Sequence, residues 1–266
     1  MPAPRFDQLH RQPGPWFVAL GGAGMFGANF YLYGSGGEWI AVDCGFALTP
    51  TPSGRNSVSV PSLAALERHD IKLSALLITH GHEDHIGAIP HLWRALDCPI
   101  YASPFAAQLI RAKLDPGLSW PRLQEIRPLE PVGIGAFQAE WIPVTHSIPE
   151  SHAIVLDVAG KRLYHSGDWK LDPQPLVGGL TAQARLQALG RQGVDVIIHA
   201  GDIYVPSCLD WLETIAPVYA VEMDGEFHFK EDPRVADKKR VLHLEGHTIG
   251  LIHDLMVPGM AQEVTE

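Results

Sequence analysis

The feature that most constrains this chain is a short run of metal-ligand side chains, Thr79-His80-Gly81-His82-Glu83-Asp84-His85, that directly follows an apolar stretch. Three imidazoles and a carboxylate within six residues offer borderline-soft nitrogen ligands and a hard oxygen ligand, a combination that suits zinc. Alternate residues of an extended segment share a face, so His80 and His82 can face one ion while Asp84 and His85 face a second. The run therefore predicts a metal site in a loop after a buried strand. The alternative, a polar loop with coincidental histidines, is disfavoured by the density of ligands.

Two later strand ends offer further ligands. His146 follows a strand expected at 137–142, and Asp168 follows a strand expected at 162–164. Either residue alone is typical of a loop or a turn, but together with the cluster they form a ligand set. Asp43 ends an earlier expected strand and is a candidate to orient the ligand loop through hydrogen bonds.

Length and composition set wider limits. The chain has 266 residues, of which 46% are hydrophobic and 19% charged, so a disordered or fibrous chain is excluded. This length accommodates one large domain, or one domain and part of a second. No apolar run approaches the ~20 residues that cross a bilayer, and residues 1–5 lack the apolar stretch of a signal peptide, so we expect a cytoplasmic protein without membrane contact. A formal charge of -10 disfavours broad electrostatic attraction to nucleic acid.

The order of expected elements indicates a mixed α/β fold. A β-meander is expected at 16–42, a loop at 47–60, and alternating strands and helices from 61 to 113, with helices at 86–96 and 104–113. Strands return at 137–164. In the last part of the chain we expect a helix at 181–192, a strand at 194–199, a helix at 208–215, a strand at 218–221 and a strand pair at 240–253.

The series Asp43, His80-x-His82-x-Asp84-His85, His146 and Asp168 resembles the motif set of the metallo-β-lactamase superfamily. Within that superfamily the chain is similar to the ribonuclease J family in four phrases, which are residues 20–29, 78–90, 145–149 and 165–173. The likeness runs from about residue 15 to about residue 193. It implies an αββα sandwich, here incomplete, in a domain of residues 1–193.

This resemblance also implies a site and an activity. His80, His82 and His146 would hold one zinc ion, Asp84 and His85 a second, and Asp168 would bridge both, which makes Asp84, His85 and Asp168 the catalytic residues. Manganese or magnesium are alternatives to zinc. Two such ions lower the pKa of a bridging water towards ~7 and neutralise developing charge. The reaction that the resemblance implies is phosphodiester hydrolysis of RNA by a metal-bridging hydroxide.

The resemblance to ribonuclease J stops after Asp168. In that family a β-CASP domain is inserted there, and we expect it to be lacking, because too little chain follows. The later histidine that would complete the second metal site has only two weak candidates, His247 and His253.

Residues 194–266 resemble the middle of small calcineurin-like metallophosphoesterases. Asp202 and His253 match that family by position, but Met223-Asp224-Gly225-Glu226 stands where Gly-Asn-x-Asp is expected. The alternative is a β-α-β segment that serves packing alone.

Three functions therefore stay open. The first is cleavage of RNA, and the second is hydrolysis of a small ester, thioester or lactone, with which the acidic charge and the lack of a β-CASP domain are compatible. The third is a non-catalytic metal-binding remnant or a metallophosphoesterase-like fusion. The sequence indicates no oligomeric state.

Overall fold

The computed structural model describes residues 14–22, 27–50, 56–114, 122–170, 172–193, 197–199, 206–214, 217–222, 232–237, 239–244 and 247–252. The contacts divide the chain into two compact units. The first comprises Met1–Gly22 and Phe26–Ala182, and the second comprises Ala23–Met25 and Gln183–Glu266. The boundary predicted at residue 193 stays a prediction, and each unit is considered by itself.

The first unit contains a six-stranded sheet, the first sheet, in the order β1-β2-β3-β6-β7-β8. Its strands are β1 (Trp16–Gly21), β2 (Phe30–Ser35), β3 (Glu38–Val42), β6 (Leu73–Leu77), β7 (Ile100–Ala102) and β8 (Leu123–Glu125). The pairs β1-β2 and β2-β3 are antiparallel, which confirms the expected meander. The strands from β3 to β8 run parallel, so each is joined to the next by a crossover that carries a helix.

A second, antiparallel sheet of the same unit has the order β12-β11-β10-β9. Its strands are β9 (Val132–Ile134), β10 (Phe137–Pro143), β11 (His152–Val158) and β12 (Lys161–His165). We call it the second sheet.

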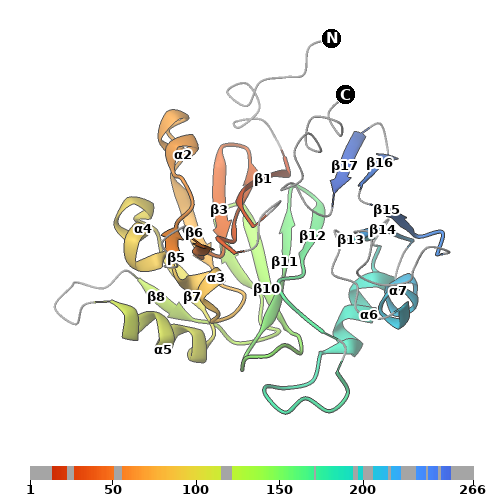
Figure 1. Cartoon of the computed structure of the whole chain (residues 1–266). Helices are drawn as coiled ribbons and strands as arrows, with labels where there is room; N and C mark the ends of the chain where they lie inside the picture. Colours follow the sequence, from red (N-terminus) through yellow and green to blue (C-terminus); the bar gives the residue numbers. More distant parts are fainter. Residues whose placement is uncertain are drawn as a thin grey trace, which may run out of the picture. The chain divides into compact units, whose positions relative to one another are not determined.

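The first sheet is covered on both faces (Figure 1). Its helices are α2 (Ala64–Arg68), α3 (Glu83–Ile86), α4 (Ile89–Leu96) and α5 (Pro104–Lys113). Apolar residues of one face pack with Ile86, Ile89 and Ile110 of these helices. Residues of the other face, Ile40 and Leu77 among them, pack with Trp141 of the second sheet. The result is an α-β-β layering in which every described helix of this unit lies against the first sheet.

Local sequence explains where α5 begins. Ser103 is its N-cap and accepts the N–H of Ala106 at 3.2 Å, while Pro104 occupies the first turn, where no N–H is required. Glu150, from the loop that carries His146, accepts the N–H of Phe105 at 2.7 Å. The start of α5 is thereby tied to that loop.

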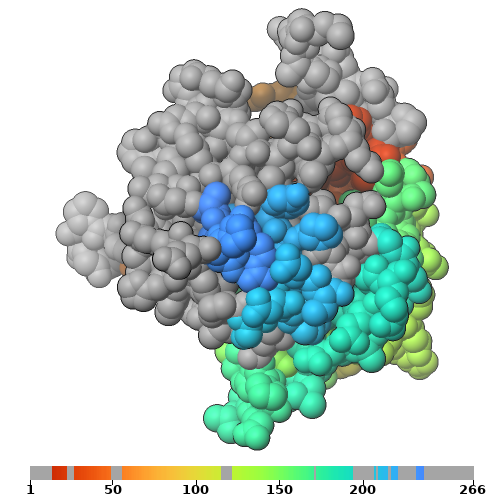
Figure 2. Space-filling view, turned by 90° about the vertical axis from the view of Figure 1, so that its right-hand side faces the viewer, coloured from red at the N-terminus to blue at the C-terminus, as the bar shows by residue number. Residues whose placement is uncertain are grey.

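The second unit contains α6 (Gln183–Arg191), β13 (Ile197–His199), α7 (Pro206–Glu213), β14 (Val218–Glu222) and β15 (Val235–Asp237). The three strands form a parallel sheet, which confirms the predicted β-α-β segment. β16 (Lys239–Leu244) and β17 (His247–Ile252) form the predicted antiparallel pair. Figure 2 shows the surface of the described part of this unit, with α6 in cyan and α7 in blue. Arg234 forms ion pairs with Asp210 and Glu213 of α7.

One expectation for the first unit was wrong. Residues 47–60 were expected to form a loop, but they contain the hairpin of β4 (Ala47–Pro50) and β5 (Asn56–Ser59). Every residue of β5 is exposed, so the alternation of buried and exposed side chains that reveals a strand is absent. Among the described helices, none combines the length and the apolar character needed to cross a membrane.

Candidate metal centre

Three histidines converge at one end of the sheet sandwich. His80 and His82 lie in the loop after β6, and His146 lies in the loop after β10. The Nε2 atom of His80 is 3.0 Å from Nδ1 of His82, which is 3.2 Å from Nε2 of His146. Nitrogen ligands at the usual distance from a tetrahedral zinc ion are separated by about 3.3 Å. The donor atoms of the three rings therefore fit a single ion.

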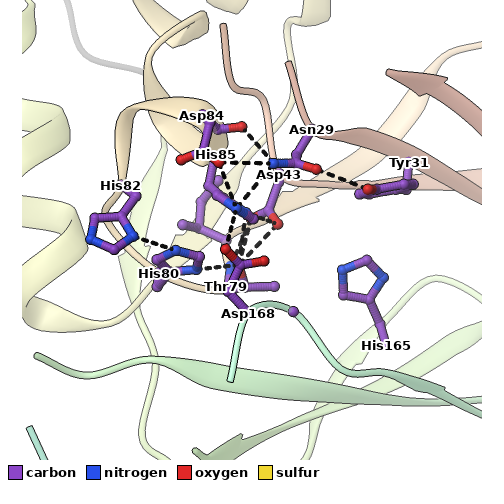
Figure 3. Close-up of polar contacts among 12 residues, drawn as sticks. Asn29, Tyr31, Asp43, Thr79, His80, His82, Asp84, His85, His165 and Asp168 are labelled. Atoms are coloured by element: carbon purple, nitrogen blue, oxygen red, sulfur yellow. Dashed lines mark hydrogen bonds and ion pairs between the residues drawn. The ribbon is translucent and has the colours of Figure 1, made fainter. Parts of the chain in front are cut away.

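A second group shares one member with the first. His80, His85 and Asp168 each offer a ligand atom within 4.8 Å of the others. The Nε2 atom of His85 is 3.4 Å from Oδ2 of Asp168 and 3.5 Å from Oδ2 of Asp84. Oδ2 of Asp168 is also 3.7 Å from Nε2 of His146, so this carboxylate lies beside both groups. Figure 3 shows Asp168 next to His80 and His85.

Asp43 and Thr79 fix the histidines at their far sides. The buried Asp43 carboxylate accepts the N–H and hydroxyl of Thr79 and lies 2.8 Å from Nδ1 of His85. A carboxylate only accepts, so Nδ1 of His85 carries a proton towards Asp43, and Nε2 is the ring nitrogen that faces the site. The Thr79 hydroxyl, having donated to Asp43, accepts from Nδ1 of His80 at 3.0 Å. Both rings thus turn Nε2 towards the ligand cluster.

The pKa values of the histidines in this site are shifted in opposite directions. Burial lowers the pKa of His80 to about 3 and also lowers the pKa of His146, so both rings are neutral at pH 7. Burial alone would lower the pKa of His85 too, but the Asp43 charge and hydrogen bonds to Asp168, Asp43 and Asp84 raise it well above its ordinary value. Burial opposes ionisation of Asp168, yet His85 holds the pKa of this carboxyl below its usual range.

The sequence pattern missed two residues at this site. The Asn29 side-chain amide lies 3.0 Å from Nε2 of His85 and 3.0 Å from the carbonyl oxygen of Asp84, and the Tyr31 hydroxyl donates to Asn29 Oδ1 at 2.9 Å. Asn29 closes the phrase of residues 20–29, which resembles the ribonuclease J family. The spacing of residues in either segment does not predict that this phrase contacts His85.

Aromatic side chains adjoin the site on the side of β1 and β12. The ring of Phe17, which is 57% exposed, stacks on Tyr31 with centroids 6.0 Å apart. Tyr31 meets His165 edge to face at 5.1 Å, and the Tyr33 hydroxyl lies 2.9 Å from Nδ1 of His165. These four rings form a continuous wall that begins at solvent and ends three residues before Asp168.

The structure brings together all of the principal candidates, Asp43, His80, His82, Asp84, His85, His146 and Asp168. The structure describes no side chain for the weaker candidates. Asp202 and His253 lie outside the described residues, and His247 begins β17 without a described side chain.

Histidine and aspartate side chains at the strand ends of a two-sheet sandwich are typical of metal-binding sites, and comparisons with known proteins identify the family. Residues 23–203 match the model of the metallo-beta-lactamase superfamily. The chain belongs to that superfamily, and the fold class expected from the sequence is confirmed. Residues 178–266 match the calcineurin-like phosphoesterase superfamily domain, as the resemblance of this part of the chain led us to expect.

Curated relatives support the resemblance to ribonuclease J. The chain is 37% identical over 188 residues to "Ribonuclease J" of Sinorhizobium meliloti, which covers 68% of this chain and 33% of the relative. It is 33% identical over 184 residues to "Ribonuclease J" of Helicobacter pylori, covering 67% of this chain and 26% of the relative. The chain thus spans a quarter to a third of the length of these relatives.

A solved structure supports the fold. The metallo-beta-lactamase fold protein YhfI from Bacillus subtilis superposes with a TM-score of 0.53 at 15% sequence identity. The match covers 77% of this chain and 84% of that one.

Proposed function

We propose that this protein is a zinc-dependent hydrolase that cleaves phosphodiester bonds in RNA. The observation that carries the proposal is the convergence of His80, His82 and His146 on one point, with His85 and Asp168 beside them. This convergence lies within the part of the chain that is similar to proteins named ribonuclease J.

The donor atoms support two ions of different character. His80, His82 and His146 form an all-nitrogen set that suits zinc, whereas Asp84, His85 and Asp168 form an oxygen-rich set that suits zinc or manganese. Asp168 adjoins both sets and is the candidate bridge. When bound, such ions polarise a phosphoryl oxygen and lower the pKa of a water molecule to near neutrality.

The chain's own residues prepare the site for this chemistry. Asp43 and Thr79 hold the rings of His85 and His80 through Nδ1, so Nε2 of each ring already faces the site. His80 is buried, whereas the Asp168 side chain is 45% exposed. Solvent therefore reaches the site at Asp168 and not at His80. A substrate therefore approaches on the side of Asp168, where the aromatic wall of Phe17, Tyr31, Tyr33 and His165 also ends.

A second candidate function is hydrolysis of a small ester, thioester or lactone. The net charge of -10 favours it, because a polyanionic RNA is repelled by an acidic protein unless a local basic groove compensates. The metal centre and its geometry would be the same for both substrates.

Cleavage assays distinguish these functions. A labelled RNA oligonucleotide is incubated with the zinc-loaded protein, with and without a chelator, beside His82→Ala, Asp168→Ala and the control His91→Ala, which changes an exposed histidine of α4. Loss of several kcal/mol of charge stabilisation predicts that kcat/KM falls about 10³-fold in the first two variants and stays unchanged in the control.

The opposite outcomes are equally specific. A zinc-loaded protein that hydrolyses lactones or thioesters but no RNA replaces the first function by the second. A protein that holds one ion tightly and turns over neither substrate class is the non-catalytic remnant.

For the rest of the chain, we propose a metallo-β-lactamase-like domain of residues 1–193 followed by a segment of residues 194–266. That segment resembles part of a metallophosphoesterase, with Asp202 and His253 as its candidate ligands. We also propose a cytoplasmic location, as the sequence predicts. Limited proteolysis tests the domain division, which predicts a stable fragment that ends near residue 193.

A further inference from the structure

The amide of Asn29 faces the second group of candidate ligands. Its Nδ2 atom lies 3.0 Å from Nε2 of His85, 3.0 Å from the carbonyl oxygen of Asp84 and 3.4 Å from Oδ2 of Asp84 (Figure 3). The two Asp84 oxygens accept hydrogen bonds, and Nε2 of His85 also accepts one in the neutral form of the ring, whose proton lies on Nδ1 towards Asp43. An amide has two N–H groups, so Asn29 has more acceptors in reach than it can satisfy at once.

The orientation of this amide is fixed by Tyr31. The Tyr31 hydroxyl donates to Asn29 Oδ1 at 2.9 Å, which leaves Nδ2 facing His85 and Asp84. A flipped amide would place its oxygen against the Asp84 carboxylate and would repel it. Gly22 makes room for this contact, since a Cβ atom there would lie 2.2 Å from the Tyr31 hydroxyl and 2.3 Å from Asn29 Oδ1.

The backbone of Asn29 is fixed to the same short helix. Its N–H donates to the carbonyl oxygen of Asp84 at 3.0 Å, and its own carbonyl accepts the N–H of Gly45 at 3.0 Å. Cys44, next to Gly45, donates to the carbonyl oxygen of His85 at 2.7 Å. The side chain of Asn29 is therefore presented to α3 from a rigid support.

We infer that Asn29, held by Tyr31, is a positioning residue for the second metal ion and determines its affinity. The inference rests on the two-ion centre proposed above. In the neutral form of His85, an Asn29 N–H can bond the lone pair of Nε2. When that nitrogen serves as a ligand, the N–H is free for Asp84 Oδ2, 3.4 Å away, and orients this carboxylate. Among the described contacts of Asn29, none involves His80, His82 or His146, so the first ion is independent of it.

Metal titration of the metal-free protein tests this inference without any assay of activity. Zinc and, separately, manganese are added to the wild-type protein, to Asn29→Ala and to Tyr31→Phe, with chelator competition and calorimetry for affinity and elemental analysis for stoichiometry. Loss of a residue that orients a ligand typically lowers metal affinity 10- to 100-fold. We expect that loss for the second ion in Asn29→Ala, a smaller loss in Tyr31→Phe, and an unchanged first ion in both.

Tyr33→Phe is the matched control. It removes a hydroxyl from the same strand, β2, but that hydroxyl contacts His165 and not Asn29, so both affinities stay at the wild-type value. General loss of structure would lower the affinity for both ions together, whereas the inference requires that only the affinity for the second ion change.

The contrary results separate this inference from the proposed function. A wild-type protein that binds two ions, with both affinities unchanged in Asn29→Ala, overturns the inference and leaves the two-ion centre intact. A wild-type protein that binds a single ion overturns both. Equal weakening of both ions in Tyr31→Phe assigns Asn29 and Tyr31 to the fold alone and also overturns the inference.

Discussion

The Nδ1 atom of His85 lies 2.8 Å from the Oδ2 atom of Asp43, and both side chains are almost fully buried. This contact fixes which ring nitrogen faces the candidate metal centre. Asp43→Asn retains the shape of the side chain but removes its charge, so the pKa of His85 falls and its tautomer is no longer fixed. We expect a 10- to 100-fold lower affinity for the second ion, measured by chelator competition. Asp157→Asn, which removes a carboxylate from a surface ion pair with Arg162, is the control and leaves metal affinity unchanged.

The occupancies of the two metal sites should depend differently on pH. Burial lowers the pKa values of His80 and His146, so these ligands need release no proton at pH 7. The pKa of His85 is raised, because Asp43 and its other partners outweigh the effect of burial. A proton on His85 therefore competes with the second ion even at pH values above ~6.5, the ordinary pKa of histidine. The affinity of the second ion therefore rises about tenfold per pH unit below the His85 pKa, while the first changes little. Elemental analysis at pH 6 and pH 8 measures this, and parallel loss of both ions at pH 6 would contradict it.

Gly45 is a site where a single methyl group should disturb the metal centre. A Cβ atom at this position would lie 1.5 Å from the carbonyl oxygen of Asp84, so α3 must move to admit it. Overpacking of this kind typically costs about 1–3 kcal/mol. Gly45→Ala should lower the free energy of unfolding by at least this amount and weaken the second ion. Gly133→Ala adds the same methyl group where nothing lies within 4 Å, and should do neither. Chemical denaturation of the metal-free proteins measures the first effect.

His152 should make the metal-free protein sensitive to acid. Its Nδ1 is buried without a hydrogen-bond partner, and burial lowers its pKa to about 4. The unfolded chain, with a histidine pKa of ~6.5, binds the proton first, so this residue destabilises the fold as the pH falls from ~6.5 to about 4. The full shift corresponds to about 3 kcal/mol.

His152→Leu should reduce that loss, because leucine binds no proton. His80 and His165 have lowered pKa values for the same reason and retain their own contributions, so we expect a smaller pH slope rather than none. Denaturant unfolding at pH 4.5 and pH 7 measures the slope. A variant with the wild-type slope would show that His152 is not the cause.

The sequence alone predicted the parts of the site that are local. The run from His80 to His85 is contiguous, and His146 and Asp168 each follow a strand with a clear apolar pattern, so strand ends and ligand chemistry located them together. The same reasoning placed Asp43 at the end of β3.

The contacts that span the fold could not be predicted in this way. Asn29 lies next to His85 because its backbone carbonyl accepts the N–H of Gly45. Tyr31 contacts Asn29 because Gly22 has no side chain to occupy the space between them. The hairpin of β4 and β5 was missed because β5 exposes all its residues, so no hydrophobic period marks it.

The origin of the ligands in two different sheets has a consequence for stability. His82 follows a strand of the first sheet and His146 a strand of the second, and the two are 64 positions apart in the chain. An ion held by both residues is a removable cross-link that closes a long loop of the unfolded chain. In the chain-entropy model a permanent link across a loop of this length is worth about 4 kcal/mol. Metal in this protein would thus join the two sheets of the sandwich much as a disulfide bond would. A chelator would remove this link, as a reductant removes a disulfide.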